Sequence, residues 1–195
     1  MSYFPLFLRL DNRRVLLVGG GTIACEKLKR LLEFTDNVSI ISPDIGDEMS
    51  QIIYEKKLHF MEKFYEKGDI KSFDIVVVAT NDIELQAQIY DESRESGCLC
   101  NCVDLVDCCD FTFPSYIKNG DLTIAISTAG SSPAVAKQLK HYLFELIPKD
   151  IDTFLQEMKN LRKTLPKGKE RMNMLEKKAK DYINNWSKRW VQKEH

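Results

Sequence analysis

Three consecutive glycines, Gly19, Gly20 and Gly21, stand between a short apolar run and a helical pattern. With Ala24 they fit Gly-x-Gly-x-x-Gly/Ala, a pattern that binds the diphosphate of a dinucleotide when it joins a strand to a helix. Gly19 would permit the tight turn, Gly21 would let a pyrophosphate approach the backbone, and Ala24 would keep the helix close to the sheet. Backbone N–H groups and the positive helix end would hold the phosphates, whereas the alternative is a plain tight turn. The predicted coenzyme residues in this stretch are Gly19, Gly20, Gly21, Thr22, Ile23 and Ala24.

Two polar clusters after later apolar runs could complete a coenzyme crevice. Pro43 and Asp44 follow the second run, where an acidic side chain would accept hydrogen bonds from the ribose hydroxyls. Such a carboxylate disfavours a 2′-phosphate, and no Lys or Arg is adjacent, so we expect NAD rather than NADP. Asp44 could instead cap the next helix. Thr80 and Asn81 follow the fourth run and could line the crevice, although Asn81 or Asp82 could simply cap a helix.

A carboxylate, Asp104, comes directly after the fifth apolar run, at the edge where parallel strands end. Beside a nicotinamide ring, this side chain could act as a general base. The alternative is a loop aspartate whose oxygens are satisfied by backbone N–H groups.

Five cysteines in the same region invite a metal hypothesis: Cys98, Cys100, Cys102, Cys108 and Cys109. Their alternate spacing places the first three on one face of a strand, whereas tetrahedral sites usually use Cys-x-x-Cys pairs on turns. Small buried side chains in a parallel strand are therefore the preferred interpretation. The three histidines are scattered along the chain, so no metal ligands are predicted.

Short apolar runs alternate with helical patterns through the first hundred residues. The runs at 14–18, 38–41, 58–61, 74–79 and 98–103 resemble buried strands, several of them rich in β-branched residues. Apolar stripes at 23–32 and 83–90 indicate helices between strands. This alternation predicts an α/β fold, a Rossmann-like parallel sheet with helices on both faces.

The pattern changes after residue 110. Asn119 and Gly120, between two strand-like runs, predict a hairpin whose two central residues have positive φ. Ser132 followed by Pro133 predicts a helix that continues to about residue 147. Two further amphipathic stripes, interrupted at 166–168, predict helices up to the C-terminus. We expect a coenzyme-binding domain over residues 1–112, a hairpin-plus-helix segment over 113–147 and a small all-helical domain over 148–195.

The composition is that of a folded chain with uneven charge. Of 195 residues 44% are hydrophobic and 29% charged, which excludes a disordered protein, and the net charge of −1 argues against a whole-chain nucleic-acid binder. No apolar run could cross a bilayer, no secretory signal is recognisable, and six cysteines are too few for a disulfide scaffold, so we expect a cytoplasmic protein. Residues 149–195 carry 13 Lys/Arg and seven Asp/Glu, which indicates either a solvated helix surface or an anionic partner.

Several motifs in this order resemble those of the precorrin-2 dehydrogenases, the module found in sirohaem synthase. They are residues 4–8 (FPLFL), residues 15–24 with Lys27, residues 79–82 (ATND), residues 101–104 (NCVD), residues 113–115 (FPS) and residues 127–133 (STAGSSP). The resemblance spans roughly residues 3–147, whereas the C-terminal helices match only in general character. Ala129 departs from the family pattern because a second glycine is common there, and the cysteine enrichment is also unusual.

This resemblance implies oxidation of precorrin-2 to sirohydrochlorin, with NAD⁺ accepting the hydride and Asp104 as the important aspartate. It also implies a homodimer built through the 113–147 segment, where Val135, Leu139 and Leu143 offer apolar surface to bury across a two-fold axis. Some family members also insert Fe²⁺, so the resemblance leaves chelatase activity open. The residues that we assign to substrate binding are Asn101, Ser127, Gly130 and Ser131.

Two other classes of function are weighed against this one. A non-catalytic NAD(H)-sensing regulator would act through the basic C-terminal helices, but we find no helix-turn-helix and no aromatic-interleaved basic surface, and we expect no nucleic-acid partner. A metal-delivery protein would use the cysteine strand. For the dehydrogenase, the basic C-terminal part would attract the many carboxylates of precorrin-2 over long range.

Overall fold

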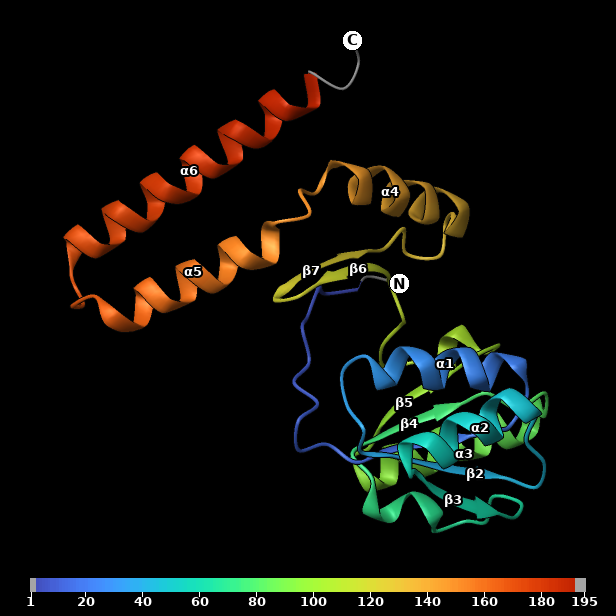
Figure 1. Ribbon diagram of the computed structural model, residues 1–195. Coiled ribbons are helices and arrows are strands. Elements are labelled where there is room, and N and C mark those ends of the chain that lie inside the picture. The colour runs from blue at the N-terminus through green and yellow to red at the C-terminus, as the bar shows by residue number, and fades with distance from the viewer. Residues whose placement is uncertain (1–2, 192–195) are drawn as a thin grey trace. The chain divides into compact units, whose positions relative to one another are not determined.

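Five strands form one parallel sheet in the computed structural model, which describes residues 3–191 (Figure 1). The strands are β1 (Val15–Val18), β2 (Val38–Ser42), β3 (His59–Glu62), β4 (Ile75–Val78) and β5 (Leu99–Cys102). Their order, β3-β2-β1-β4-β5, is that of a Rossmann fold. All residues of β1 and β4 are buried, because these central strands are covered on both faces. The predicted fold class is therefore confirmed. The first two and last four residues of the predicted domains lie outside the described residues.

Three helices cover the sheet: α1 (Thr22–Leu32), α2 (Asp47–Lys56) and α3 (Ile83–Ser96). The crossovers β1–α1–β2 and β4–α3–β5 run in opposite directions along the sheet, so right-handed connections place α1 and α3 on opposite faces. Leu16 and Val76 belong to the same core cluster as Ile89 of α3. Ala24 and Leu28 of α1 are fully buried, and α1 contacts β1 and β2.

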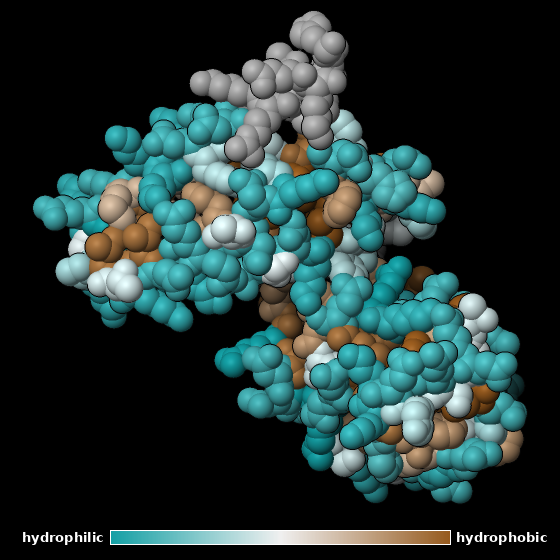
Figure 2. Space-filling view, viewed as in Figure 1, coloured by the Kyte–Doolittle hydropathy of each residue, from teal (hydrophilic) through white to brown (hydrophobic). Residues whose placement is uncertain are grey.

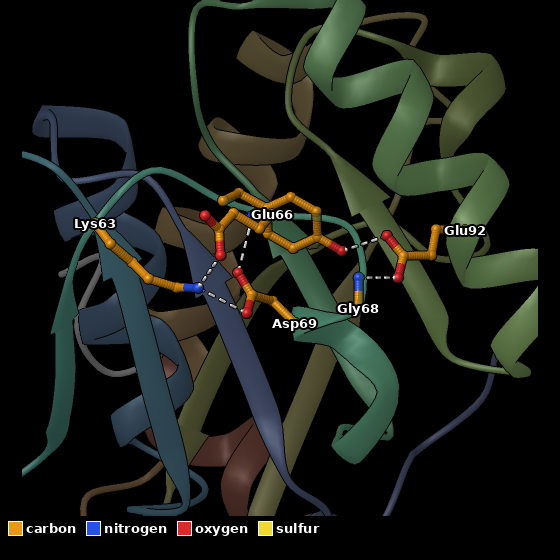
Figure 3. Close-up of polar contacts among 6 residues, drawn as sticks. Lys63, Glu66, Gly68, Asp69 and Glu92 are labelled. Atoms are coloured by element: carbon orange, nitrogen blue, oxygen red, sulfur yellow. Dashed lines mark hydrogen bonds and ion pairs between the residues drawn. The ribbon is translucent and has the colours of Figure 1, made fainter.

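The loop after β3 is fastened to α3 by a buried carboxylate (Figure 3). Glu92 is 7% exposed and accepts hydrogen bonds from the Tyr65 hydroxyl at 2.8 Å and from the Gly68 N–H at 2.7 Å. Burial, and then the adjacent Glu92 carboxylate, raise the pKa of Tyr65, so its hydroxyl remains a donor. From the same loop, Lys63 forms an ion pair at 2.9 Å with Asp69, the first residue of the short helix η1 (Asp69–Ser72).

The residues from Phe113 on form a second compact unit, separate from Tyr3–Thr112. The unit contains the hairpin of β6 (Ser115–Asn119) and β7 (Leu122–Ile126), followed by α4 (Pro133–Leu146), α5 (Ile151–Thr164) and α6 (Lys169–Val191). Helix α4 contacts β6, and α5 contacts β7. The rings of Phe154 and Tyr182 stack between α5 and α6 with centroids 3.9 Å apart. The predicted break at 166–168 is found, whereas a domain boundary at residue 148 stays a prediction.

The hairpin turn lies one residue further along the chain than the sequence pattern predicts. Asn119 still pairs with Leu122, so the central residues are Gly120 and Asp121. Gly120 has φ +56°, the positive value required at the first central position of a type II′ turn. The shift has a tertiary cause, because the Asp121 N–H donates to Oδ1 of Asp152 in α5 at 3.1 Å.

Ser132 caps α4 as predicted, its Oγ accepting from the Val135 N–H at 3.3 Å. Within residues 3–191, no helix has the length and apolar character needed to span a membrane. In Figure 2, hydrophilic residues cover most of the visible face of each unit.

Candidate functional site

The glycine turn after β1 is tightly enclosed by neighbouring backbone. Gly19 has φ +123°, and its N–H donates to the Ile41 carbonyl at 2.9 Å. A Cβ on Gly19 would lie 2.3 Å from the Ala79 carbonyl oxygen, so only glycine fits there. The turn therefore packs between the ends of β2 and β4, at the carboxyl edge of the sheet.

The next two glycines differ sharply in their surroundings. A Cβ on Gly20 would lie 1.9 Å from the Asp44 carbonyl oxygen, so the chain that follows β2 leaves no room for a side chain at Gly20. A Cβ on Gly21 would meet nothing within 4 Å. Gly21 is also the N-cap of α1, which has neither a capping side chain nor an acidic residue in its first turn.

This open helix end fits the diphosphate of a dinucleotide. The first N–H groups of a helix have no partner within it, and the helix dipole makes this end positive. Thr22 and Ile23 at the start of α1 are exposed, whereas Ala24 is fully buried against the sheet. The chain thus presents amides and open space at Gly21 while Ala24 keeps the helix close, as the pattern predicts.

Pro43 and Asp44 lie beside the glycine turn at the exit of β2. The Ser42 hydroxyl donates to the Asp44 carbonyl at 2.5 Å, and the Gly46 N–H donates to the Gly20 carbonyl at 3.2 Å. Helix α2 begins after Gly46, its N-cap, so the alternative that Asp44 caps this helix is wrong. The Asp44 residue is exposed next to the glycine turn, where a ribose would lie.

The strip of residues 79–82 forms the other wall of the turn. The Ala79 N–H donates to the Val18 carbonyl at 2.8 Å. Asp82 is the N-cap of α3, with Oδ1 accepting from the Leu85 N–H at 3.0 Å, so Thr80 and Asn81 are not needed as caps. Gln86 is not among the residues predicted from the sequence, yet its Nε2 donates to the Thr80 carbonyl at 2.7 Å. The sequence feature that could have identified it is a glutamine on the apolar face of a predicted helix.

Asn101 and Asp104 lie at the end of β5, in the same unit as the glycine turn. Asn101 is 5% exposed; its Nδ2 donates to the Phe111 carbonyl at 2.8 Å, and its Oδ1 has no partner among the described residues. Asp104 is exposed in the loop between β5 and the short helix η2 (Val106–Cys108). It therefore faces solvent at the carboxyl edge of the sheet.

The remaining predicted substrate residues belong to the second unit, in the loop between β7 and α4. The Ser127 Oγ accepts from the Ala129 N–H at 3.1 Å, and the Ser131 N–H donates to the Thr128 carbonyl at 2.9 Å. Ala129 and Gly130 have φ +49° and +82°. The backbone at Ala129 is therefore in the left-handed region, which favours glycine and accounts for the glycine expected at this position from the resemblance.

The cysteines pack mainly as core side chains. Cys98, Cys100 and Cys102 are buried in the cluster beneath α3, and the Sγ atoms of Cys100 and Cys102 are 3.7 Å apart. Burial raises the pKa of Cys98 to about 12, which disfavours a metal-binding thiolate. In the part of the chain that the structure describes, no three His, Cys, Asp or Glu side chains are grouped to hold a metal ion.

Comparisons with known proteins agree with this geometry. A family model described as "Putative NAD(P)-binding" matches residues 6–115, and one described as "Sirohaem biosynthesis protein central" matches residues 119–141. A structure of "SirC, precorrin-2 dehydrogenase" has a TM-score of 0.74 at 24% identity and covers 95% of this chain and 100% of its own, which supports the fold.

Curated relatives share the same region of sequence. The siroheme synthases of Pseudoalteromonas translucida and Mannheimia succiniciproducens are 32% and 34% identical over 151 residues, 77% of this chain. That of Methylococcus capsulatus is 32% identical over 162 residues, 83% of this chain. The chain spans about a third of these relatives, 32% to 34% of their length. The resemblance seen in the motifs is thereby confirmed, and the chain belongs to the nicotinamide-coenzyme-binding, or NAD(P)-binding, family whose model it matches.

Proposed function

We propose that the protein oxidises precorrin-2 to sirohydrochlorin, with NAD⁺ as hydride acceptor. The observation that carries this proposal is the uncapped N-terminus of α1, where Gly21 borders open space while Gly19, two residues earlier, packs against the Ala79–Thr80 backbone. The naming of similar proteins as siroheme synthases supports the choice of substrate.

The coenzyme would be held by backbone and by one carboxylate. The N–H groups of the first turn of α1 bind its diphosphate, and Thr80 and Asn81 line the crevice. The exposed Asp44 carboxylate accepts hydrogen bonds from the ribose hydroxyls and repels a 2′-phosphate, so NAD is preferred to NADP. When bound, the coenzyme supplies the site that accepts the hydride.

The chemical step that the chain's own residues perform is removal of a proton from the substrate. Precorrin-2 loses two electrons and two hydrogens, one as the hydride and one as a proton, and the Asp104 carboxylate removes the proton. Exposure of Asp104 at the carboxyl end of β5 supports this role. The substrate contact assigned to Asn101 stays a prediction, because its Oδ1, without a partner among the described residues, is buried.

An anaerobic assay with precorrin-2 and NAD⁺ tests this proposal. We expect NADH to form only when both are present. Asp104→Asn should bind NAD⁺ normally in calorimetry and lose about 100-fold or more in turnover, the usual contribution of a general base. Coenzyme binding without turnover in the wild type would favour an NAD(H)-sensing regulator, and no heat with NAD⁺ or NADH would contradict the proposal. Adding Fe²⁺ to the product then measures chelatase activity.

We also propose that the protein is a homodimer joined through the 113–147 segment. Val135, Leu139 and Tyr142 lie along one face of α4 and are 50%, 43% and 54% exposed. With Ala134 and Gln138 they line a shallow hollow of about 350 Å³. An exposed apolar stripe of this kind is typical of an interface between copies. Leu139→Glu should convert dimer to monomer in analytical ultracentrifugation, whereas the charge change Lys137→Glu beside it should not; a wild-type monomer would refute the dimer.

We place the protein in the cytoplasm. All six cysteines are free, including Cys100 and Cys102 with Sγ atoms 3.7 Å apart, which suits a reducing compartment. Cell fractionation with an antibody to the full chain tests this, and recovery from an oxidising compartment would contradict it.

A further inference from the structure

A glutamine is buried where the start of α3 meets the sheet. Gln86 has no exposed surface. Its Nε2 donates to the Thr80 carbonyl at 2.7 Å, whereas its Oε1 is buried without a hydrogen-bond partner among the described residues. A buried acceptor without a partner destabilises the fold, and an apolar side chain of equal length would avoid that cost. The amide thus makes one bond and leaves one acceptor unpaired, so its net contribution to stability is small and the bond to Thr80 is what distinguishes it from an apolar side chain.

The bond that Gln86 does make acts on the wall of the coenzyme crevice. The Thr80 carbonyl is in the strip 79–82, which touches the glycine turn so closely that a Cβ on Gly19 would lie 2.3 Å from the Ala79 carbonyl oxygen. Because there is no free space between strip and turn, a displacement of Thr80 must move Gly19 or its neighbours. The amides that face the diphosphate follow directly after Gly19.

The main chain of Gln86 also joins the strip to β5. Its N–H donates to the Asp82 carbonyl at 3.0 Å, and its own carbonyl accepts a bond from the Cys102 thiol at 3.5 Å. Cys102 lies two residues before Asp104. Position 86 thus contacts the crevice wall on one side and, on the other, the strand that leads to the proposed base.

We propose that Gln86 is a positioning residue of the coenzyme site. Its Nε2 fixes the Thr80 carbonyl, and through the Ala79 contact it fixes the glycine turn in the conformation that binds diphosphate. Gln86 itself touches no coenzyme. This inference rests on the proposed function, because Gln86 would shape a crevice that binds a coenzyme only if that proposal holds.

Gln86→Met in the full-length chain tests the role, since methionine keeps the length of the side chain and lacks both amide atoms. We expect calorimetry to give an affinity for NAD⁺ weakened by up to about tenfold; the value of one hydrogen bond is the upper bound, because this bond lies within the protein and acts on binding only through the shape of the turn. The urea midpoint should change little, because removal of the unpaired Oε1 offsets the loss of the bond to the Thr80 carbonyl. In the coenzyme-free protein, amides of residues 79–82 should exchange with solvent faster. In turnover assays, KM for NAD⁺ should rise much more than kcat falls.

Ser93→Ala is the matched control. Ser93 is also fully buried on α3, and its Oγ donates to the Tyr90 carbonyl at 2.6 Å, away from the strip. It should leave NAD⁺ affinity and exchange at 79–82 unchanged. Equal affinity of Gln86→Met and wild type would overturn the positioning role, whereas a wild type that binds no NAD⁺ would instead overturn the proposed function. If Gln86→Met does not fold, Gln86→Leu replaces it, and failure of both to fold makes Gln86 structural and also overturns the role.

Discussion

Gly19 and Ala79 are in such close contact that a single methyl group cannot be placed between them: a Cβ on Gly19 would lie 2.3 Å from the Ala79 carbonyl oxygen. This contact links the turn after β1 to the strip after β4. The shape of the proposed coenzyme crevice therefore depends on two strands that are sixty residues apart in sequence.

Alanine at the first and third glycines should have opposite effects on stability and binding. Gly19→Ala forces a side chain into a left-handed conformation and against backbone, so we expect the free energy of unfolding to fall by about 2–4 kcal/mol. Gly21→Ala should change it by less than about 1 kcal/mol, because its Cβ meets no protein atom. The methyl group would, however, enter the space of the diphosphate and weaken NAD⁺ binding by about tenfold or more. Urea unfolding and calorimetry measure the two effects, and equal stability losses would contradict the difference in surroundings.

Asp44→Ser should shift coenzyme preference. Removing the carboxylate takes away charged hydrogen bonds to the ribose and repulsion of a 2′-phosphate, so the NADP⁺ to NAD⁺ affinity ratio should rise about tenfold or more. Asp47→Ser, in the first turn of α2, is the charge-matched control and should leave the ratio nearly unchanged. A ratio that Asp44→Ser does not alter would show that Asp44 is not at the ribose.

The Glu92 network should stabilise the fold without affecting coenzyme binding. Glu92→Ala leaves the partly buried Gly68 N–H and Tyr65 hydroxyl without their acceptor, and we expect unfolding free energy to fall by about 2–3 kcal/mol. Tyr65→Phe removes one of the two bonds and should cost about 1 kcal/mol.

The matched control for Glu92 is Glu95→Ala on the same helix. Glu95 forms an exposed ion pair with Lys67 at 4.0 Å, so its loss should change unfolding free energy by less than about 0.5 kcal/mol. Similar urea midpoints for Glu92→Ala and Glu95→Ala would show that the Glu92 network contributes little.

Asp74 should make stability depend on pH in acid. The Arg14 N–H at 2.8 Å, and then the Arg13 guanidinium at 3.0 Å, hold the pKa of Asp74 below its ordinary value. As pH falls, Asp74 therefore takes up a proton in the unfolded chain before it does so in the folded protein. The stabilisation is complete above the unfolded pKa of about 4 and is lost as pH falls through the lower folded pKa. Between pH 5 and pH 3, the urea midpoint of Asp74→Asn should fall less than that of wild type.

The control for this pH dependence is Asp36→Asn, at an exposed position before β2. Its midpoint should change with pH in parallel with wild type. If the urea midpoint of Asp74→Asn also changes with pH in parallel with that of wild type, the bonds from Arg13 and Arg14 do not stabilise the charged carboxylate.

Features with a local physical cause were predictable from sequence. Strands such as β4 follow from short β-branched runs, the start of α4 from Ser132 and Pro133, and the glycine turn from its spacing between a strand and a helix. Each is encoded within a few residues, because backbone preferences and capping act over one turn or less. The hairpin turn was misplaced by one residue because its position also depends on Asp152, thirty-one residues away from Asp121.

The order of elements, the parallel α/β class and the place of the glycine turn follow from local sequence patterns. Three features follow only from packing: Gly20 is enclosed while Gly21 is open, Gly46 rather than Asp44 caps α2, and Gln86 donates to the Thr80 carbonyl. The reason is that these features depend on atoms brought together from different strands. Local propensity carries no information on which distant carbonyl will lie against a given Cα, so only packing settles it.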